Sequence, residues 1–516
     1  MKKERLPLDR IYSLIGVGIL LAVALLILGL INLDRTPPLY WDEGWTLSVA
    51  RNWVERGHYG RLLAGQPVAP GLEAAISVTG PVALSFYLFG VGVWQGRLVG
   101  VLFMLATLGI TYYLVRLLYN QSVAIGTLAV LLLLSMYPQL HPLFIGRTVL
   151  AELPMLFYLL LGYTFFFLAL NRSARFIPAA LVFWGIALIT KAQLLPFWTI
   201  SLGLPLMIML CKRRWRVAGL LAAGSIGSLL VSRLLFWLQQ LLLQGHTLPN
   251  PPLRGVYYFT ALVPQAPNRL HALRITLIAG FPTLLGLFYA TWKYIKNSRE
   301  VSASESGDCI RLTLIVLAGS WFAWYLLLSV GWARYLFPAT FVGSIFVAAM
   351  LRDLTDDFSL SSTIRRGAST LRRSHLSWQN SRALLTIIVT AWSLSLTLKG
   401  LYHIYFIFPD TSAQQVAYFL NTQTPSNTLT ETYESELHFL VNRRYHYPPD
   451  QTHVDLNLRN LGKDVAIQYD PLAADPDYLV IGSVGHGSEL YKAVLDKKAF
   501  RILRTYGSYD VYERVR

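Results

Sequence analysis

Charged residues are scarce in this chain of 516 residues: 14% are Asp, Glu, Lys or Arg, whereas 54% are hydrophobic. This composition excludes an ordinary soluble protein, in which about a quarter of the residues carry charge. The mean hydropathy of +0.45 is typical of a chain with many membrane-spanning segments. We therefore expect a polytopic membrane protein.

Cysteine is also scarce, with only Cys211 and Cys309 in the whole chain. Both are predicted to lie at cytoplasmic helix ends, where a reducing environment disfavours a disulfide. The His, Asp and Glu residues show no spacing typical of a metal cage. No metal or other cofactor is therefore expected.

A cleavable leader is not expected either. The apolar run at residues 11–33 is too long for the core of a signal peptide, and no small-residue cleavage motif follows it. The net charge of +17 comes from short basic clusters between apolar runs. Such clusters orient membrane helices by the positive-inside rule, so no nucleic-acid partner is expected.

Eleven segments are predicted to cross the membrane: residues 11–33, 98–115, 122–137, 153–170, 176–189, 194–210, 217–238, 275–292, 312–330, 335–351 and 384–406. The basic clusters then predict a cytoplasmic N-terminus and an extracytoplasmic C-terminal segment in the plasma (inner) membrane. Residues 80–94 are apolar but shorter than the roughly 20 residues of a span. We expect them to be interfacial or re-entrant, because a twelfth span would reverse every later basic cluster.

Two domains are predicted: residues 1–406, with long outer loops at 34–97 and 239–274, and residues 407–516. Short β-type runs at 478–481 and 509–512 alternate with possible helices at 412–422 and 488–497, which predicts a small α/β domain. The Gly-rich residues 482–487 match no phosphate-binding fingerprint and are interpreted as a turn. The Ser/Arg-rich residues 359–382 are expected to be a flexible connector.

Six charged residues near helix ends are predicted to face the outer compartment: Asp42, Glu43, Arg147, Glu152, Lys191 and Arg334. Each has an ordinary explanation, such as a helix cap, a local ion pair or a lysine reaching the interface. A charge inside the bilayer costs about 2.5–3.5 kcal/mol on insertion scales and usually persists for a use. Together, the carboxylates suit removal of a proton from a hydroxyl, and the cations suit a departing phosphate.

The motifs that hold these charges carry a family resemblance. They are Trp41-Asp42-Glu43, Arg147 with Glu152, Thr190-Lys191 and Arg334-Tyr335-Leu336-Phe337-Pro338. Over about residues 10–350 the pattern resembles the GT-C glycosyltransferases of the protein O-mannosyltransferase and aminoarabinose transferase (ArnT-like) superfamily, glycosyltransferase family 39 type. The resemblance implies an all-α polytopic GT-C fold followed by an extracytoplasmic α/β domain.

The resemblance also implies an activity. It is the inverting transfer of a hexosyl or pentosyl group from a polyprenyl-phosphate donor to a hydroxyl of a glycan, lipid or protein acceptor. Asp42 would be the catalytic base, with Glu43 and Glu152 as supporting carboxylates, and Lys191, Arg334 and Arg147 would bind the donor phosphate. Further candidate substrate contacts are Tyr40, Arg51, His58 and Tyr335. The alternative is a secondary transporter or flippase for lipid-linked sugars, which predicts ionisable residues at the membrane midplane.

Overall fold

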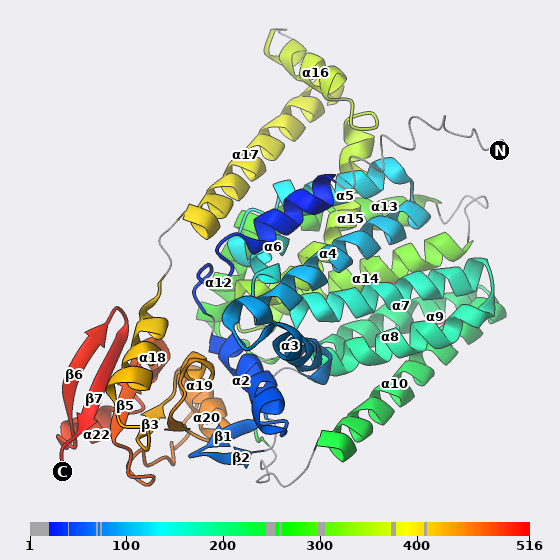
Figure 1. Ribbon diagram of the computed structural model, residues 1–516. Coiled ribbons are helices and arrows are strands. Elements are labelled where there is room, and N and C mark those ends of the chain that lie inside the picture. Colours follow the sequence, from blue (N-terminus) through cyan, green and yellow to red (C-terminus); the bar gives the residue numbers. More distant parts are fainter. Residues whose placement is uncertain are drawn as a thin grey trace.

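The computed structural model describes residues 20–39, 41–68, 71–72, 75–243, 253–256, 258, 261–297, 305–372, 378–406 and 410–516. Within these ranges a large bundle of helices lies beside a small domain built on a five-stranded sheet (Figure 1). The predicted fold class, a helical membrane protein with a small C-terminal α/β domain, is confirmed.

The N-terminal 406 residues contain both the helices at the predicted spans and others, such as Trp41–Arg56 and Leu360–Arg372, in segments predicted to be loops. The helices of both kinds are Leu20–Leu30, α2 (Trp41–Arg56), α3 (Ile76–Phe89), α4 (Val93–Leu118), α5 (Gln121–Leu133), α6 (Pro142–Gly146), α7 (Glu152–Asn171), α8 (Ile177–Thr190), α9 (Leu194–Cys211), α10 (Trp215–Leu243), α12 (Ala266–Ile275), α13 (Phe281–Asn297), α14 (Glu305–Leu327), α15 (Phe337–Leu354), α16 (Leu360–Arg372) and α17 (Trp378–Phe406). The short helical turns η1 (Pro138–Leu140), η2 (Ala174–Phe176) and η4 (Ala333–Leu336) and the π-helical η3 (Thr276–Gly280) connect some of them.

Eight described helices are long and apolar enough to cross a membrane, so the chain is a multi-span membrane protein. Four further apolar helices are shorter: Leu20–Leu30, Ile76–Phe89, Gln121–Leu133 and Ala174–Thr190. The eleven predicted spans are mostly helical where the structure describes them, but residues 31–33, 134–137 and 328–330, at the ends of three of these spans, are not helical. Residues 80–94 contain the end of α3, a break at Gly90 with φ 84°, and the start of α4. Glycine ends the helix there because its missing Cβ permits a positive φ.

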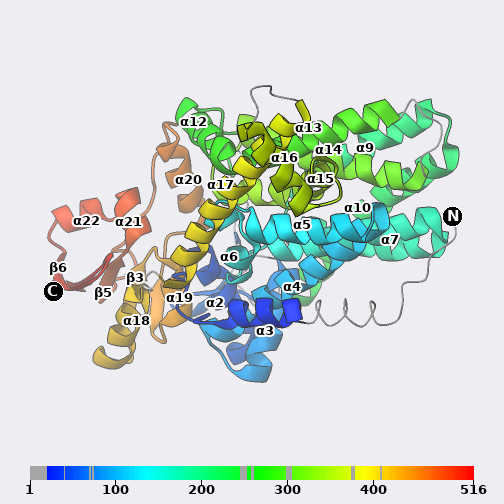
Figure 2. The ribbon, with the colours of Figure 1, turned by 90° about the horizontal axis from the view of Figure 1, so that it is seen from above.

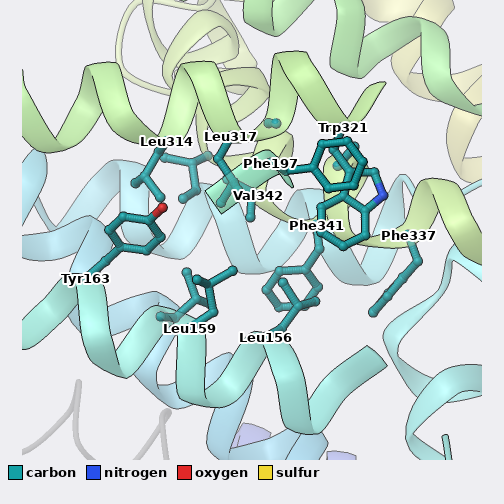
Figure 3. Packing of buried hydrophobic residues seen from close by; sticks show 14 of the residues in the cluster. Leu156, Leu159, Tyr163, Phe197, Leu314, Leu317, Trp321, Phe337, Phe341 and Val342 are labelled. Atoms are coloured by element: carbon teal, nitrogen blue, oxygen red, sulfur yellow. The ribbon is translucent and has the colours of Figure 1, made fainter. Parts of the chain in front are cut away.

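The bundle core is made of large apolar side chains from α7, α9, α14 and α15 (Figure 3). Leu156 and Tyr163 of α7 face Leu314 and Trp321 of α14 (Figure 3). In a bilayer, helices associate by close packing rather than by the hydrophobic effect, and small residues at crossings are therefore informative. At the crossing of α7 and α8, a Cβ on Gly162 would lie 2.2 Å from the ring of the buried Trp184 on α8.

The basic turns and the C-terminal domain lie at opposite ends of the bundle. The turn between α7 and α8, with basic residues 172 and 175, and the turn between α9 and α10, with residues 212–216, lie away from the C-terminal domain (Figure 1). The C-terminal domain caps the other end. The segment 359–382, expected to be a flexible connector, instead forms α16 over Leu360–Arg372, and this helix packs on α17.

The C-terminal domain has the strand order β4-β3-β5-β7-β6. Its strands are β3 (Leu429–Thr432), β4 (Arg444–His446), β5 (Tyr478–Ile481), β6 (Phe500–Tyr506) and β7 (Tyr509–Arg514); β4, β3 and β5 are parallel, and β7 and β6 are antiparallel to their neighbours. Its helices are α18 (Ser412–Gln423), α19 (Ser435–Leu440), α20 (Asp450–Asn460), α21 (Ser483–Ser488) and α22 (Lys492–Asp496). Seen from above, α19 and α2 lie between this sheet and the bundle (Figure 2).

The predicted elements of this domain are partly matched. The helix at 412–422 corresponds to α18, and the strands at 478–481 and 509–512 correspond to β5 and part of β7. The helix expected at 488–497 is wrong in extent, because α21 ends near Glu489, which has a left-handed φ of 52°, and α22 begins anew. The Gly-rich residues 482–487, interpreted as a turn, are instead the N-cap and most of α21, and the N–H groups of Gly482 and Gly485 donate to the carboxylate of Glu434.

Candidate active site

A cleft of about 760 Å³ lies where the bundle meets the C-terminal domain. Four of the six predicted outer charges line it: Asp42, Glu152, Lys191 and Arg334. Each sits at a helix end. Asp42 is in the first turn of α2 and Glu152 opens α7, positions where a carboxylate interacts favourably with the helix dipole. Lys191 follows the last residue of α8, and Arg334 lies in η4 ahead of α15.

The four charges form two ion pairs. Arg334 donates to the carboxylate of Asp42, and the two side chains are 11% and 30% exposed. Lys191 Nζ lies 2.6 Å from Glu152 Oε1, with Glu152 almost fully buried. Tyr335, a predicted substrate contact, also lines the cleft, and its ring centroid lies 5.4 Å from both Lys191 Nζ and Arg334 Cζ. Both cations thus lie near one aromatic ring, and each is paired with a carboxylate.

Glu43 takes a different position from its neighbour Asp42. Its carboxylate accepts two hydrogen bonds from Arg97, at 3.0 and 2.7 Å, and one from the N–H of Val149 at 2.8 Å. The Glu43 and Arg97 side chains are both 0% exposed. Glu43 is not among the described residues that line the cleft. Glu43 anchors the start of α2 to the bundle, so it can support Asp42 only by holding the helix turn that carries Asp42.

Arg97 was missed by the sequence analysis, although a lone arginine within an apolar run is a readable signal. Besides Glu43, it donates to the backbone carbonyls of Leu33, Pro37 and Pro38. It therefore holds the segment before α2 as well as α2 itself.

Arg147, predicted to bind the donor phosphate, is placed elsewhere by the structure. Its guanidinium is fully buried and donates to the carbonyls of Leu28, Ile31 and Thr36, and to the Thr36 hydroxyl. It also lies over the ring of Tyr405, with 4.8 Å from Cζ to the centroid. Unsatisfied backbone carbonyls are costly inside a membrane protein, and Arg147 satisfies those at the end of the first helix. The observed role is structural.

The remaining candidate contacts lie outside the cleft or outside the described residues. Arg51 donates to the Phe439 carbonyl at 2.7 Å and to Glu55 at 2.8 Å, and so ties α2 to α19. His58 follows α2, and burial lowers its pKa below the usual value. Neither Arg51 nor His58 is among the described residues lining the cleft. Tyr40 lies outside the described residues.

The C-terminal domain contacts the Trp41-Asp42 segment directly. Trp41 Nε1 donates to the Tyr433 carbonyl at 3.0 Å, and Ser435 Oγ donates to the Trp41 carbonyl. The Trp41 ring stacks on His453, with centroids 4.7 Å apart. A Cβ on Gly44 would lie 2.3 Å from the backbone of Ser435, so only glycine permits this approach of α19 to α2.

The loops that follow parallel strands β3 and β5 therefore face the cleft, as is common at the carboxyl ends of parallel strands. They bring Tyr433 and Ser483 to it, and α20 brings His453 and Asn457. Burial lowers the pKa of His453 to about 4, although the nearby carboxylates of Asp42 and Asp450 oppose the shift. His453 is neutral at physiological pH. No signal in the sequence links these tail residues to Asp42.

No group of three or more His, Cys, Asp or Glu side chains in the described part of the chain is arranged to hold a metal ion. Cys211 is exposed and Cys309 buried, and both are free thiols.

Two known structures share the arrangement of bundle and C-terminal domain. ArnT from Cupriavidus metallidurans, bound to undecaprenyl phosphate, matches with a TM-score of 0.62 and 15% identity, over 97% of this chain and 98% of that chain. The archaeal oligosaccharyltransferase AglB from Archaeoglobus fulgidus, in complex with an inhibitory peptide and a dolichol-phosphate, matches with a TM-score of 0.56 and 11% identity, over 96% of this chain and 74% of that chain. These similarities confirm the predicted GT-C fold. No family model matches the sequence, and a search of curated proteins finds no match.

Proposed function

From the GT-C fold and the charged cleft, we propose that the protein is an inverting membrane glycosyltransferase. It moves a sugar from a polyprenyl-phosphate donor to an acceptor hydroxyl at the outer face of the plasma membrane. The observation that carries the proposal is the meeting of two carboxylates and two cations in one cleft. The structures with the same fold are described with undecaprenyl phosphate or dolichol-phosphate, which supports a lipid-phosphate donor.

Lys191 and Arg334 are the residues that bind the donor phosphate in this proposal. Both are only slightly exposed, 15% and 11%, and each is paired with a carboxylate in the cleft. A phosphate offers more acceptor oxygens and more charge than one carboxylate, and charge-assisted bonds to it are among the stronger hydrogen bonds. Its arrival would therefore draw Arg334 from Asp42 and leave that carboxylate to the acceptor.

The chemical step is a direct displacement. The acceptor oxygen attacks the anomeric carbon while the bond from that carbon to the phosphate oxygen breaks, and the polyprenyl phosphate leaves with the electron pair. Asp42 takes the proton of the attacking hydroxyl. Lys191 and Arg334 stabilise the negative charge on the leaving phosphate. Glu152 keeps Lys191 in place, because the Lys191–Glu152 pair is more deeply buried than the pair that Arg334 makes with Asp42.

The orientation of the protein belongs to the same proposal. The turns with basic residues 172, 175 and 212–216 lie at the bundle end away from the cleft. By the positive-inside rule that end faces the cytoplasm. The cleft and the C-terminal domain then face the outer compartment.

Replacing Asp42 with Asn tests the proposal. Asp42→Asn keeps the size of the side chain and its place in the first turn of α2, but it cannot take a proton. We expect transfer from polyprenyl-phosphate sugar to fall by about 10²–10⁴-fold, the usual contribution of a positioned base. Binding of undecaprenyl phosphate should be retained.

The matched control is Asp34→Asn, in the segment that leads to α2. Asp34 is 50% exposed, pairs only with the exposed Arg35 among the described ion pairs, and does not line the cleft. Its replacement should leave transfer unchanged. Near-normal transfer by the Asp42→Asn protein would refute the assignment of the base.

A further inference from the structure

The charges of the cleft are divided unevenly between its two walls. All four charged side chains among the described lining residues come from the bundle: Asp42, Glu152, Lys191 and Arg334. The C-terminal domain contributes no Asp, Glu, Lys or Arg among the described residues of the lining. We call its polar lining residues the neutral wall: Tyr433, His453, Asn457, Asn460, Ser483 and Ser488.

Four residues of the neutral wall are held by hydrogen bonds within the C-terminal domain. His453 Nδ1 lies 2.7 Å from the Tyr433 hydroxyl, and Asn457 Nδ2 donates to the His453 carbonyl at 2.8 Å. Ser488 Oγ donates to the Gly485 carbonyl at 3.0 Å. Because burial also keeps His453 uncharged at neutral pH, the wall offers amide and hydroxyl groups without a formal charge.

Two aromatic rings lie between the neutral wall and the proposed base Asp42. Trp41 and Trp45 both line the cleft, with ring centroids 4.3 Å apart, and Trp41 stacks on His453. Aromatic and aliphatic lining with a few convergent polar groups is the usual make-up of a site for a neutral organic ligand. An anionic ligand group would lose its hydration here and find no Lys or Arg among the described lining residues of the C-terminal domain.

The geometry of the displacement reaction indicates whether the donor or the acceptor lies along the neutral wall. The nucleophile approaches the anomeric carbon from the side opposite the phosphate. With the phosphate on Lys191 and Arg334, the acceptor must approach from elsewhere while still reaching Asp42. Asp42 directly follows Trp41, whose ring stacks on His453 with centroids 4.7 Å apart, so the proposed base lies close to the neutral wall. The acceptor hydroxyl therefore arrives along the C-terminal domain.

We propose, resting on the transferase function above, that the neutral wall binds an uncharged sugar residue of the acceptor. The acceptor class is then a neutral glycan or the neutral sugar of a glycolipid. A phosphorylated headgroup and a peptide are the classes that this surface disfavours. Sites built to hydrogen-bond hydroxyl groups discriminate strongly, because their polar groups are left unpaired by the wrong ligand.

The test uses the full chain in nanodiscs loaded with undecaprenyl phosphate and measures saturation-transfer NMR without turnover. The probes are neutral trisaccharides of gluco, galacto and manno configuration, their phosphate esters, and a serine-containing hexapeptide. We expect at least one neutral trisaccharide to receive saturation more strongly than its phosphate ester and the peptide. When undecaprenyl phosphate is replaced by polyprenyl-phosphate mannose, the bound trisaccharide should not be displaced.

Variants assign the contact to the wall. Asn460 is exposed in the cleft, and Asn460→Ala should weaken trisaccharide binding about threefold to tenfold, the range for one lost hydrogen bond. Asn427→Ala, at an exposed residue of the same domain outside the cleft lining, is the matched control. Asn460→Arg should shift preference toward the phosphate ester.

The outcomes separate this inference from the transferase proposal. Stronger saturation of the phosphate ester or the peptide, no saturation of any neutral trisaccharide, or equal effects of Asn460→Ala and Asn427→Ala would each overturn the inference. Displacement by polyprenyl-phosphate mannose would assign the wall to the donor sugar and overturn it as well. Failure of the transferase proposal appears separately, as absent binding of undecaprenyl phosphate.

Discussion

The buried pair of Arg97 and Glu43 holds the start of α2, which carries the proposed base Asp42, and this role can be tested through stability. Arg97 is 0% exposed and donates to the Glu43 carboxylate and to three backbone carbonyls. Arg97→Met would leave a fully buried carboxylate without its cation. Removing one partner of a buried ion pair typically costs about 3–5 kcal/mol. We expect a marked fall in the unfolding midpoint in detergent.

Glu43→Gln should cost less than Arg97→Met. The amide oxygen can still accept from the N–H of Val149 and from Arg97, and Arg97 keeps its three carbonyl partners. The double variant Arg97→Met with Glu43→Gln should be more stable than Arg97→Met alone, because no unpaired charge remains. This non-additivity is the signature of a direct pair, as in a double-mutant cycle.

Midpoints from thermal unfolding, together with transfer rates measured well below them, provide the assay. Transfer should fall in Arg97→Met even where the protein is folded, because Asp42 adjoins Glu43 in the first turn of α2. Arg35→Leu is the matched control, since Arg35 pairs with Asp34 at the surface and such pairs are worth at most about 1 kcal/mol. Equal midpoints for Arg97→Met and Arg35→Leu would refute the reasoning.

Three further predictions follow from the cleft and the C-terminal domain. Lys191→Ala and Arg334→Ala should each weaken binding of undecaprenyl phosphate at least tenfold. The control Lys293→Ala, which removes a lysine paired with Asp353, should not weaken it. If all three variants bind undecaprenyl phosphate with equal affinity in titration, the phosphate site lies elsewhere. Burial raises the pKa of both Glu434 and Glu436, so the folded state binds protons that the unfolded chain has released. The two carboxyls therefore contribute to the free energy of unfolding below the ordinary carboxyl pKa, and this contribution is lost as the pH rises through the raised pKa values. The unfolding midpoint should decline from about pH 5 to about pH 9, and the decline should be less steep in Glu436→Gln. An unchanged slope in Glu436→Gln would contradict this. Alkaline phosphatase fused to the C-terminus should be active and a fused GFP dark, and the reverse would contradict the proposed orientation.

The sequence by itself was enough for the membrane class and the course of the bundle. Long apolar segments between basic clusters need no tertiary contact to be recognised, because the bilayer imposes length and polarity on each helix separately. Each predicted span coincides over most of its described length with a helix of the structure. The same physics singled out Asp42, Glu152, Lys191 and Arg334, since charges at membrane-helix ends are few.

Which of these charges share a cleft was decided only by the tertiary structure. Asp42 and Glu43 are adjacent in sequence, but α2 turns one toward Arg334 and the other toward the buried Arg97. Arg147 resembles the other outer cations in sequence, yet it satisfies backbone carbonyls at the end of the first helix. A local pattern cannot distinguish these outcomes, because a helix end presents neighbouring residues to different partners.

The second wall of the cleft was also invisible in the sequence. Tyr433 and His453 lie almost 400 positions beyond Trp41, and they meet it through α19 and α20. Their contact depends on the close approach at Gly44 and on loops at the carboxyl ends of β3 and β5. Composition and periodicity report which residues form helices and strands, whereas contacts between distant segments depend on the shapes of both surfaces. The sequence thus determined a membrane bundle with charges at its helix ends, and the packing of the C-terminal domain on α2 places four of those charges in one cleft.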